Sequence, residues 1–336
     1  MMRLPWFDYR APRSVAEASK IRAGEGPGAM LIAGGTDLLP NMKRRHQTPK
    51  VLVSLKGIGE LKKVSNGSGM TFGSGLTLSE ILKIEKIPTA LRQAAGQVAT
   101  VHLRNMGTLG GNLCLDTRCN YYNQNYEWRK AIDFCLKKDG DICWVATASK
   151  RCVAVSSTDT APALIALNAV VRLAGPSGAR EIPAENLYNN DGIDYLSRKP
   201  DEVLTEIRIP ESGFKSTYWK LRRRGAFDFP ILGVAVALRF SSGNIIENAR
   251  VALGAAASRP FLVEKASEYL KGKKLSDEVI TEASLLIASR AKPLDNTDMD
   301  LYWRKEVADD FAGYALRELR GDDMRETRLR IARHLV

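Results

Sequence analysis

The chain has 336 residues, of which 44% are hydrophobic and 26% charged, and its formal net charge is +12. This composition excludes a disordered, collagen-like or small disulfide-linked protein, and the length predicts two or three structural units rather than one core. No apolar run approaches the roughly 20 residues of a membrane span, and the N-terminus lacks a signal-peptide pattern, so we expect a cytoplasmic protein that does not contact a membrane. Because the basic residues are spread along the chain, the charge favours an acidic partner over a nucleic acid.

Capping residues and hydrophobic spacing predict helices alternating with strands up to about residue 215. Ser14 and Glu17 have the spacing of a capping box and predict a short helix. The apolar run 29–33 predicts a strand that leads through two glycines into a helix beginning at Leu38. Further predicted elements are a strand at 51–55, a helix opened by a second capping box at Thr77 and Glu80, helices at 88–98 and 160–167, and strands at 170–173 and 203–209.

Beyond residue 215 the pattern changes to long β-type runs at 216–222, 231–240 and 245–253. Two helices are expected after these strands, and Ser276 can cap the second of them. The change of pattern predicts an α+β N-terminal part and a C-terminal part made of a sheet and helices.

Two glycine loops are candidate ligand-binding segments. Ala33-Gly34-Gly35-Thr36-Asp37 follows a predicted strand, and Thr108-Leu109-Gly110-Gly111-Asn112 lies about 75 residues later. Glycines allow the backbone to approach a ligand closely, and consecutive N–H groups suit a pyrophosphate. Each loop alone is equally well explained as a tight turn, whereas the pair indicates the two sides of one dinucleotide.

All five cysteines lie between positions 114 and 152. Their odd number and the missing signal pattern argue against a disulfide framework and favour a reducing compartment. Their clustering predicts a local metal or iron–sulfur site. Four thiolates suit either zinc or an iron–sulfur cluster, so the spacing alone leaves that choice open.

Together with Asp159-Thr160-Ala161-Pro162-Ala163-Leu164, the two loops resemble the signatures of the FAD-binding subunits of molybdenum hydroxylases, a family that includes xanthine and carbon monoxide dehydrogenases. The resemblance covers nearly the whole chain. It implies an α+β fold: an FAD-binding domain of two α/β subdomains of the vanillyl-alcohol-oxidase type, then a C-terminal domain of antiparallel sheet and helices. The implied boundaries are 1–215, divided into 1–56 and 57–215 with an iron–sulfur insertion at 114–155, and 216–336.

The resemblance also implies which residues bind FAD. Asp159 would accept hydrogen bonds from the ribose hydroxyls, and Lys220 would lie beside the flavin, unless it is simply a solvated lysine on a strand. The full implied set is Leu31, Ile32, Ala33, Gly34, Gly35, Thr36, Asp37, Leu38, Thr108, Leu109, Gly110, Gly111, Asn112, Asp159 and Lys220.

The cysteine segment departs from the general family, in which about ten residues separate the second loop from the Asp159 motif. The longer segment here resembles the β subunit of 4-hydroxybenzoyl-CoA reductase, which carries an added [4Fe-4S] cluster. The implied ligands are Cys119, Cys135, Cys143 and Cys152. Cys114 is expected to be a free thiol, with exchange for Cys119 as the alternative.

The implied function is electron transfer within a molybdenum enzyme of aromatic degradation that removes the phenolic hydroxyl of 4-hydroxybenzoyl-CoA. No catalytic residue is expected on this chain. Implied partners are a molybdopterin-containing large subunit and a small [2Fe-2S] subunit, assembled as a dimer of heterotrimers, with a ferredoxin as electron donor. Two alternatives stay open: the FAD subunit of another molybdenum hydroxylase that passes electrons to NAD or a quinone, and a zinc-stabilised nucleotide-binding regulatory protein.

Overall fold

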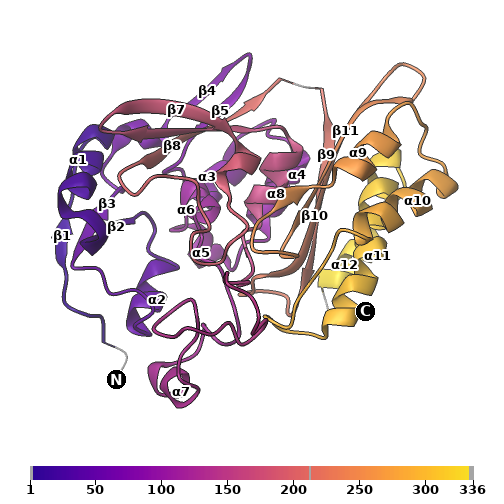
Figure 1. Cartoon of the computed structure of the whole chain (residues 1–336). Coiled ribbons are helices and arrows are strands. Elements are labelled where there is room, and N and C mark those ends of the chain that lie inside the picture. The colour runs from indigo at the N-terminus through magenta and orange to yellow at the C-terminus, as the bar shows by residue number, and fades with distance from the viewer. Residues whose placement is uncertain (1–2, 212, 333–336) are drawn as a thin grey trace.

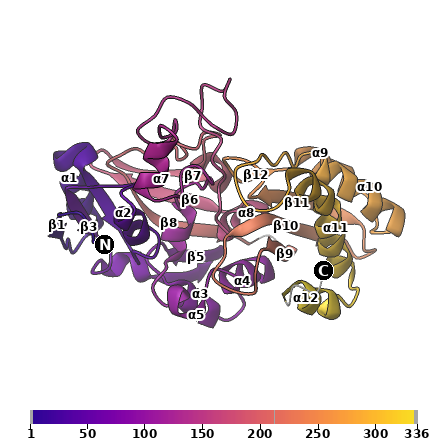
Figure 2. The ribbon, with the colours of Figure 1, turned by 90° about the horizontal axis from the view of Figure 1, so that it is seen from below.

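A computed structural model describes residues 3–211 and 213–332, which contain three β-sheets arranged in sequence order (Figure 1). Seen from below, the sheets follow one another along the long axis of the molecule (Figure 2). None of the helices in the described ranges is long and apolar enough to cross a membrane.

The first sheet is parallel and has the strand order β1-β3-β2. Its strands are β1 (Asp8–Arg10), β2 (Ala29–Ile32) and β3 (Val51–Ser54). Helix α1 (Val15–Glu25) covers it, and Val15, Ala18 and Val53 share a small core. Because the strands are parallel, their carboxyl ends lie at one edge, and the first glycine loop leaves β2 at that edge.

The second sheet is antiparallel, with the order β4-β5-β8-β6-β7. Its largest core cluster includes Phe72, Leu91, Leu164 and Ile207, contributed by the sheet and by the helices packed on it. The elements of this part are β4 (Val64–Gly67), β5 (Gly69–Gly73), α3 (Leu78–Lys83), α4 (Thr89–Gly96), α5 (Val101–Arg104), α6 (Leu109–Leu113), α7 (Tyr126–Ala131), α8 (Thr160–Ala166), β6 (Val170–Gly175), β7 (Gly178–Pro183) and β8 (Val203–Pro210).

The third sheet is antiparallel with the order β12-β11-β10-β9. Its strands are β9 (Lys215–Arg222), β10 (Pro230–Phe240), β11 (Ile246–Gly254) and β12 (Phe261–Leu262). Helices α4 and α8 of the preceding part pack on this sheet, and so do α9 and α11 of its own part. The burial of β10 explains its almost unbroken apolar sequence. The expected α+β class is therefore confirmed.

The expectation of two helices after the third sheet was wrong, because the described chain has four. They are α9 (Glu264–Leu270), α10 (Asp277–Ala288), α11 (Leu301–Arg320) and α12 (Arg325–Ala332). The buried side of α11 consists largely of small residues such as Ala308, Ala312 and Ala315, which give a weak hydrophobic pattern. Ser276 does cap α10, since its hydroxyl accepts a hydrogen bond from the Val279 N–H.

The cysteine segment contains little regular structure. Its one α-helix in the described ranges, α7, projects away from the sheets (Figure 1). Arg118 and Val155 pair through two backbone hydrogen bonds of 2.8 and 2.7 Å, which bring the two ends of the segment together. Short 3-10 helices at Gly26–Gly28, Gly59–Lys62 and Ala184–Leu187 complete the described structure.

Candidate functional site

A cavity of about 960 Å³ is bordered by both glycine loops and extends to residues of the C-terminal part. This volume is at the upper end of the range for small-molecule and cofactor sites. The structure brings together most of the residues implied by the sequence. Those bordering the cavity are Leu31, Ile32, Ala33, Gly34, Gly35, Thr36, Asp37, Leu38, Thr108, Gly110, Gly111, Asn112 and Asp159.

The first loop requires glycine for two separate reasons. A Cβ atom on Gly34 would lie 1.9 Å from the carbonyl oxygen of Met106, two residues before the second loop begins at Thr108. Gly35 has φ +70°, in the left-handed region that favours glycine. The two loops therefore pack backbone against backbone, and together they form one wall of the cavity.

The second loop is held by hydrogen bonds of its own. The Thr108 hydroxyl accepts from the Gly111 N–H at 3.0 Å, so it caps α6. The side-chain oxygen of Asn112 accepts from the Thr158 hydroxyl at 2.8 Å and from the Thr160 hydroxyl at 2.6 Å. Asn112 thus ties the second loop to the segment of Asp159. Leu109 faces away from the cavity and belongs to the main core cluster.

Asp159 and Lys220 form a buried ion pair at the cavity wall. The carboxylate of Asp159 accepts from the Tyr218 hydroxyl at 3.0 Å and from the Lys220 ammonium at 3.1 Å. The ammonium also donates to the carbonyl oxygen of Gln97. Asp159 borders the cavity, whereas Lys220 lies behind it, outside the described residues that line it. Burial raises the pKa of Asp159, and the nearby ammonium opposes this shift.

Arg118 is a site residue that the sequence analysis missed. Its guanidinium pairs with Asp37 of the first loop and lies 4.4 Å from the ring centroid of Phe229. Both Arg118 and Phe229 border the cavity. Arg118 directly precedes Cys119, and neither Arg118 nor Phe229 was assigned a role from the sequence. Other lining segments that were not predicted are 227–231 and 296–298.

The five cysteines separate into two groups. Cys114 borders the large cavity, and the other four border a second, much smaller cavity of about 10 Å³, which is lined in part by Cys119, Cys135, Cys143 and Cys152. Cys119 borders both cavities. All five are free thiols. Burial raises the pKa of Cys119 to about 12 and that of Cys152 to about 11, so a metal must displace their protons on binding.

The small cavity is bordered by four thiols, the donor type that a zinc ion or an iron–sulfur cluster takes. Across residues 3–211 and 213–332, no three His, Cys, Asp or Glu side chains converge closely enough to hold one metal ion. Cys119, Cys135, Cys143 and Cys152 nevertheless border one cavity, and four cysteine thiolates are the ligands of a [4Fe-4S] cluster. The cavity has room for about one water molecule, so the surrounding segments must separate to admit a cluster.

The paired glycine loops and the three-sheet fold define a class of flavin-binding subunit. The family model described as the FAD binding domain in molybdopterin dehydrogenase matches residues 5–212, and the CO dehydrogenase flavoprotein C-terminal domain matches residues 216–319. The chain belongs to this family of FAD-binding subunits.

Among its relatives, the aldehyde oxidoreductase FAD-binding subunit PaoB of Escherichia coli is 31% identical over 79% of this chain and 86% of its own length. The carbon monoxide dehydrogenase medium chain of Afipia carboxidovorans is 28% identical over 90% of this chain and 92% of its own length. The solved carbon monoxide dehydrogenase of Hydrogenophaga pseudoflava is similar with a TM-score of 0.76, at 26% identity, over 94% of this chain and 97% of the matched chain. These similarities support FAD binding by this chain and its role as a subunit of an oxidoreductase.

Proposed function

We propose that this chain is the electron-transfer subunit of a molybdenum-containing reductase, and that it carries FAD in the large cavity and a [4Fe-4S] cluster on Cys119, Cys135, Cys143 and Cys152. The observation that carries the proposal is the position of Cys119, which borders both cavities. FAD exchanges electrons singly or in pairs and an iron–sulfur cluster exchanges them singly, so together they suit a relay between one-electron carriers.

The chain's own residues would hold the flavin by three contacts. The backbones of the two glycine loops would contact the pyrophosphate. Gly34 packs so closely on Met106 that no larger side chain fits at this position in the cavity wall. Asp159 would face the ribose, with its carboxylate fixed by Tyr218 and Lys220. Because Lys220 lies behind Asp159, it acts on the flavin site through that carboxylate.

The proposed overall reaction is the reductive dehydroxylation of 4-hydroxybenzoyl-CoA. Two electrons and two protons convert the substrate to benzoyl-CoA and release its hydroxyl oxygen as water. The substrate would bind on a molybdopterin-containing large subunit, a small [2Fe-2S] subunit would complete each heterotrimer, and a ferredoxin would supply the electrons. The motive is the resemblance of the whole cysteine segment to the corresponding reductase subunit, joined to the observation that four of its thiols border one cavity.

Cofactor analysis of protein purified without oxygen tests this proposal. The expected result is one non-covalent FAD and about four iron and four acid-labile sulfide per chain. Flavin bands with broad iron–sulfur absorption agree with it, whereas zinc in place of iron would refute the cluster. Activity of the assembled complex with 4-hydroxybenzoyl-CoA and reduced ferredoxin tests the reaction, and turnover only in the oxidative direction with NAD or a quinone would favour another molybdenum hydroxylase.

A further inference from the structure

Lys137 is the one Lys or Arg side chain among the described residues that border the cysteine cavity. The other lining residues are the four cysteines and the side chains of Tyr121, Tyr122, Leu136, Trp144, Val145 and Ala154. The Lys137 side chain is only 6% exposed. In surroundings of low polarity a buried charge acts more strongly on its neighbours than it would in water.

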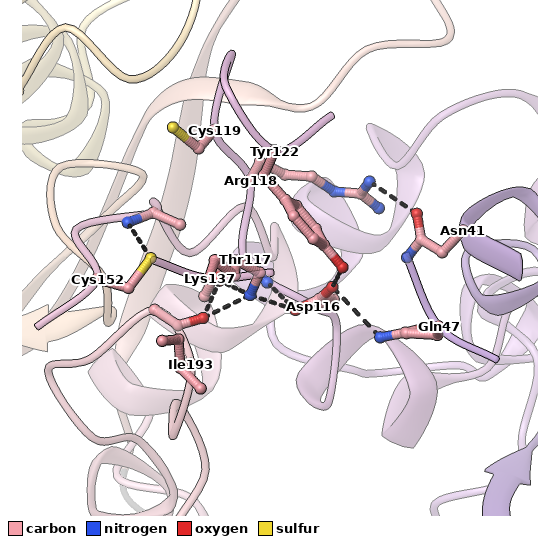
Figure 3. Close-up of polar contacts among 12 residues, drawn as sticks. Asn41, Gln47, Asp116, Thr117, Arg118, Cys119, Tyr122, Lys137, Cys152 and Ile193 are labelled. Atoms are coloured by element: carbon pink, nitrogen blue, oxygen red, sulfur yellow. Dashed lines mark hydrogen bonds and ion pairs between the residues drawn. The ribbon is translucent and has the colours of Figure 1, made fainter. Parts of the chain in front are cut away.

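Hydrogen bonds fix the ammonium group of Lys137 in place (Figure 3). It donates to the Asp116 carboxylate at 2.8 Å, to the Thr117 hydroxyl at 2.7 Å and to the carbonyl oxygen of Gly192. Its backbone belongs to the turn of Cys135, because the next residue donates its N–H to the carbonyl oxygen of Cys135 at 2.8 Å. The backbone of Lys137 therefore lies in the same turn as one of the proposed ligands, and its ammonium group is held in a fixed position.

The Asp116 carboxylate is equally constrained. It accepts from the Tyr122 hydroxyl at 3.0 Å, from the side-chain amide of Gln47 at 3.3 Å and from the Thr117 N–H at 2.9 Å (Figure 3). Asp116 borders the flavin cavity and Lys137 the cysteine cavity. Of the two charged residues in this ion pair, Lys137 is therefore the one that borders the cysteine cavity.

We propose that Lys137 is a positioning residue that raises the reduction potential of the centre bound by the four cysteines, and that Asp116 moderates this effect. The inference rests on the proposed function, in which these cysteines hold a cluster. A thiolate-bound cluster becomes more negative when it is reduced, so a nearby cation stabilises the reduced form, and local charge is one of the properties that set such potentials.

Redox titration of the purified holo-complex, followed by the electron paramagnetic resonance of the reduced cluster, tests the proposal. Lys137→Met should lower the midpoint potential, with a decrease of about tenfold in the equilibrium constant for reduction, or about 59 mV for one electron. Asp116→Asn should shift the potential in the opposite direction, because it leaves the ammonium uncompensated. Lys137→Arg keeps the charge and should restore most of the original value.

Lys138→Met is the matched control, since Lys138 is the adjacent residue and its ammonium pairs with Asp139 on the surface. It should leave the potential unchanged. A purely structural role for Lys137 predicts shifts of the same sign in the Met and Asn variants, and that result would overturn the proposal. If the Lys137→Met protein loses its iron, the test rests on the midpoint potential of the Asp116→Asn protein. An unchanged potential in that variant refutes the proposal. Wild-type protein without iron would instead refute the proposed cluster.

Discussion

At the scale of single residues, the buried charges of the flavin site depend on one another. Lys220 has a fully buried side chain and contacts Asp159, the carbonyl oxygen of Gln97 and the carbonyl oxygen of Asp228. The sequence analysis expected Lys220 either beside the flavin or as a solvated lysine on a strand, and its buried side chain excludes the second of these. In the structure its first partner is a carboxylate, so its main contribution is to keep that carboxylate ionised in a buried place.

We predict that Lys220→Met destabilises the protein by about 3–5 kcal/mol, because it leaves Asp159 buried without its partner. The pKa of Asp159 is already raised by burial. The folded variant therefore takes up a proton on Asp159 before the unfolded chain does, and its deficit is largest at neutral pH and shrinks as the pH falls. Urea unfolding followed by circular dichroism at several pH values measures this.

The double variant Lys220→Met/Asp159→Asn should recover most of that loss. Lys215→Met is the control, since Lys215 lies on the same strand with an exposed side chain. If Lys220→Met costs no more than Lys215→Met, the buried pair does not contribute as described.

At the scale of elements, the flavin cavity depends on the contact between two turns: the turn from β2 into helix α2 (Leu38–Lys43) and the turn between α5 and α6. We predict that Gly34→Ala lowers FAD content severalfold, because a methyl group 1.9 Å from the Met106 carbonyl oxygen forces the two turns apart. Gly59→Ala is the matched control, since a Cβ there meets nothing within 4 Å. The flavin-to-protein ratio of both purified variants tests this prediction. A Gly34→Ala protein with full flavin content would contradict it.

The cysteine segment gives a second prediction at this scale. Single replacement of Cys119, Cys135, Cys143 or Cys152 by Ser should remove or degrade the cluster while FAD is largely retained, because the glycine loops lie outside the segment. Cys114→Ser should keep the iron, since Cys114 does not border the small cavity among the residues that the structure describes. Iron and flavin analysis of the five variants checks this. Loss of iron in Cys114→Ser but not in Cys119→Ser would show that Cys114 is the ligand and Cys119 the free thiol.

At the scale of the whole molecule, the third sheet joins the two parts of the chain. Helices α4 and α8 from the FAD-binding part pack on it, as do α9 and α11. Tyr218 and Lys220 on β9 reach Asp159 across this junction. The C-terminal part therefore helps to build the flavin cavity, and removing it would leave Asp159 without two of its hydrogen-bond donors.

The charge of the whole chain leads to the last prediction. Ferredoxins are typically acidic, so the net charge of +12 would attract such a carrier. Salt screens this attraction, and the Debye length is about 10 Å at 0.1 M ionic strength. Stopped-flow reduction of the flavin in the complex should be fast with reduced ferredoxin, slow with NADH, and slower at high ionic strength. A rate that does not depend on salt would contradict the long-range attraction of ferredoxin by the positive charge. Rapid reduction by NADH would contradict the proposed electron route through the cysteine segment.

The sequence predicted those features that depend on local chemistry. The capping box at Thr77 is complete, since the Thr77 hydroxyl accepts from the Glu80 N–H and the Glu80 carboxylate accepts from the Thr77 N–H. The box at Ser14 is only half formed, because the carboxylate of Glu17 accepts instead from the N–H of Arg13.

Features that depend on distant contacts could not be predicted in the same way. Strand β4 is exposed along its length and so has no alternating hydrophobic pattern to indicate it. The pairing of Arg118 with Asp37 joins positions 81 residues apart, and nothing local to either residue specifies it. Both glycine loops were found because their composition is unusual, whereas the partner that makes Gly34 indispensable, Met106, has no distinctive pattern.

The closed ends of the cysteine segment bear on how such a subunit can evolve. Arg118 pairs with Val155, and Asn112 bonds to Thr158 and Thr160, so the chain leaves the flavin domain and returns to it at nearly the same place. The entropy of closing a loop between fixed anchors grows only slowly with its length. An ancestral domain could therefore gain tens of residues at this site without a change in the path of its core strands, and the segment with Cys119, Cys135, Cys143 and Cys152 could be acquired in one genetic event.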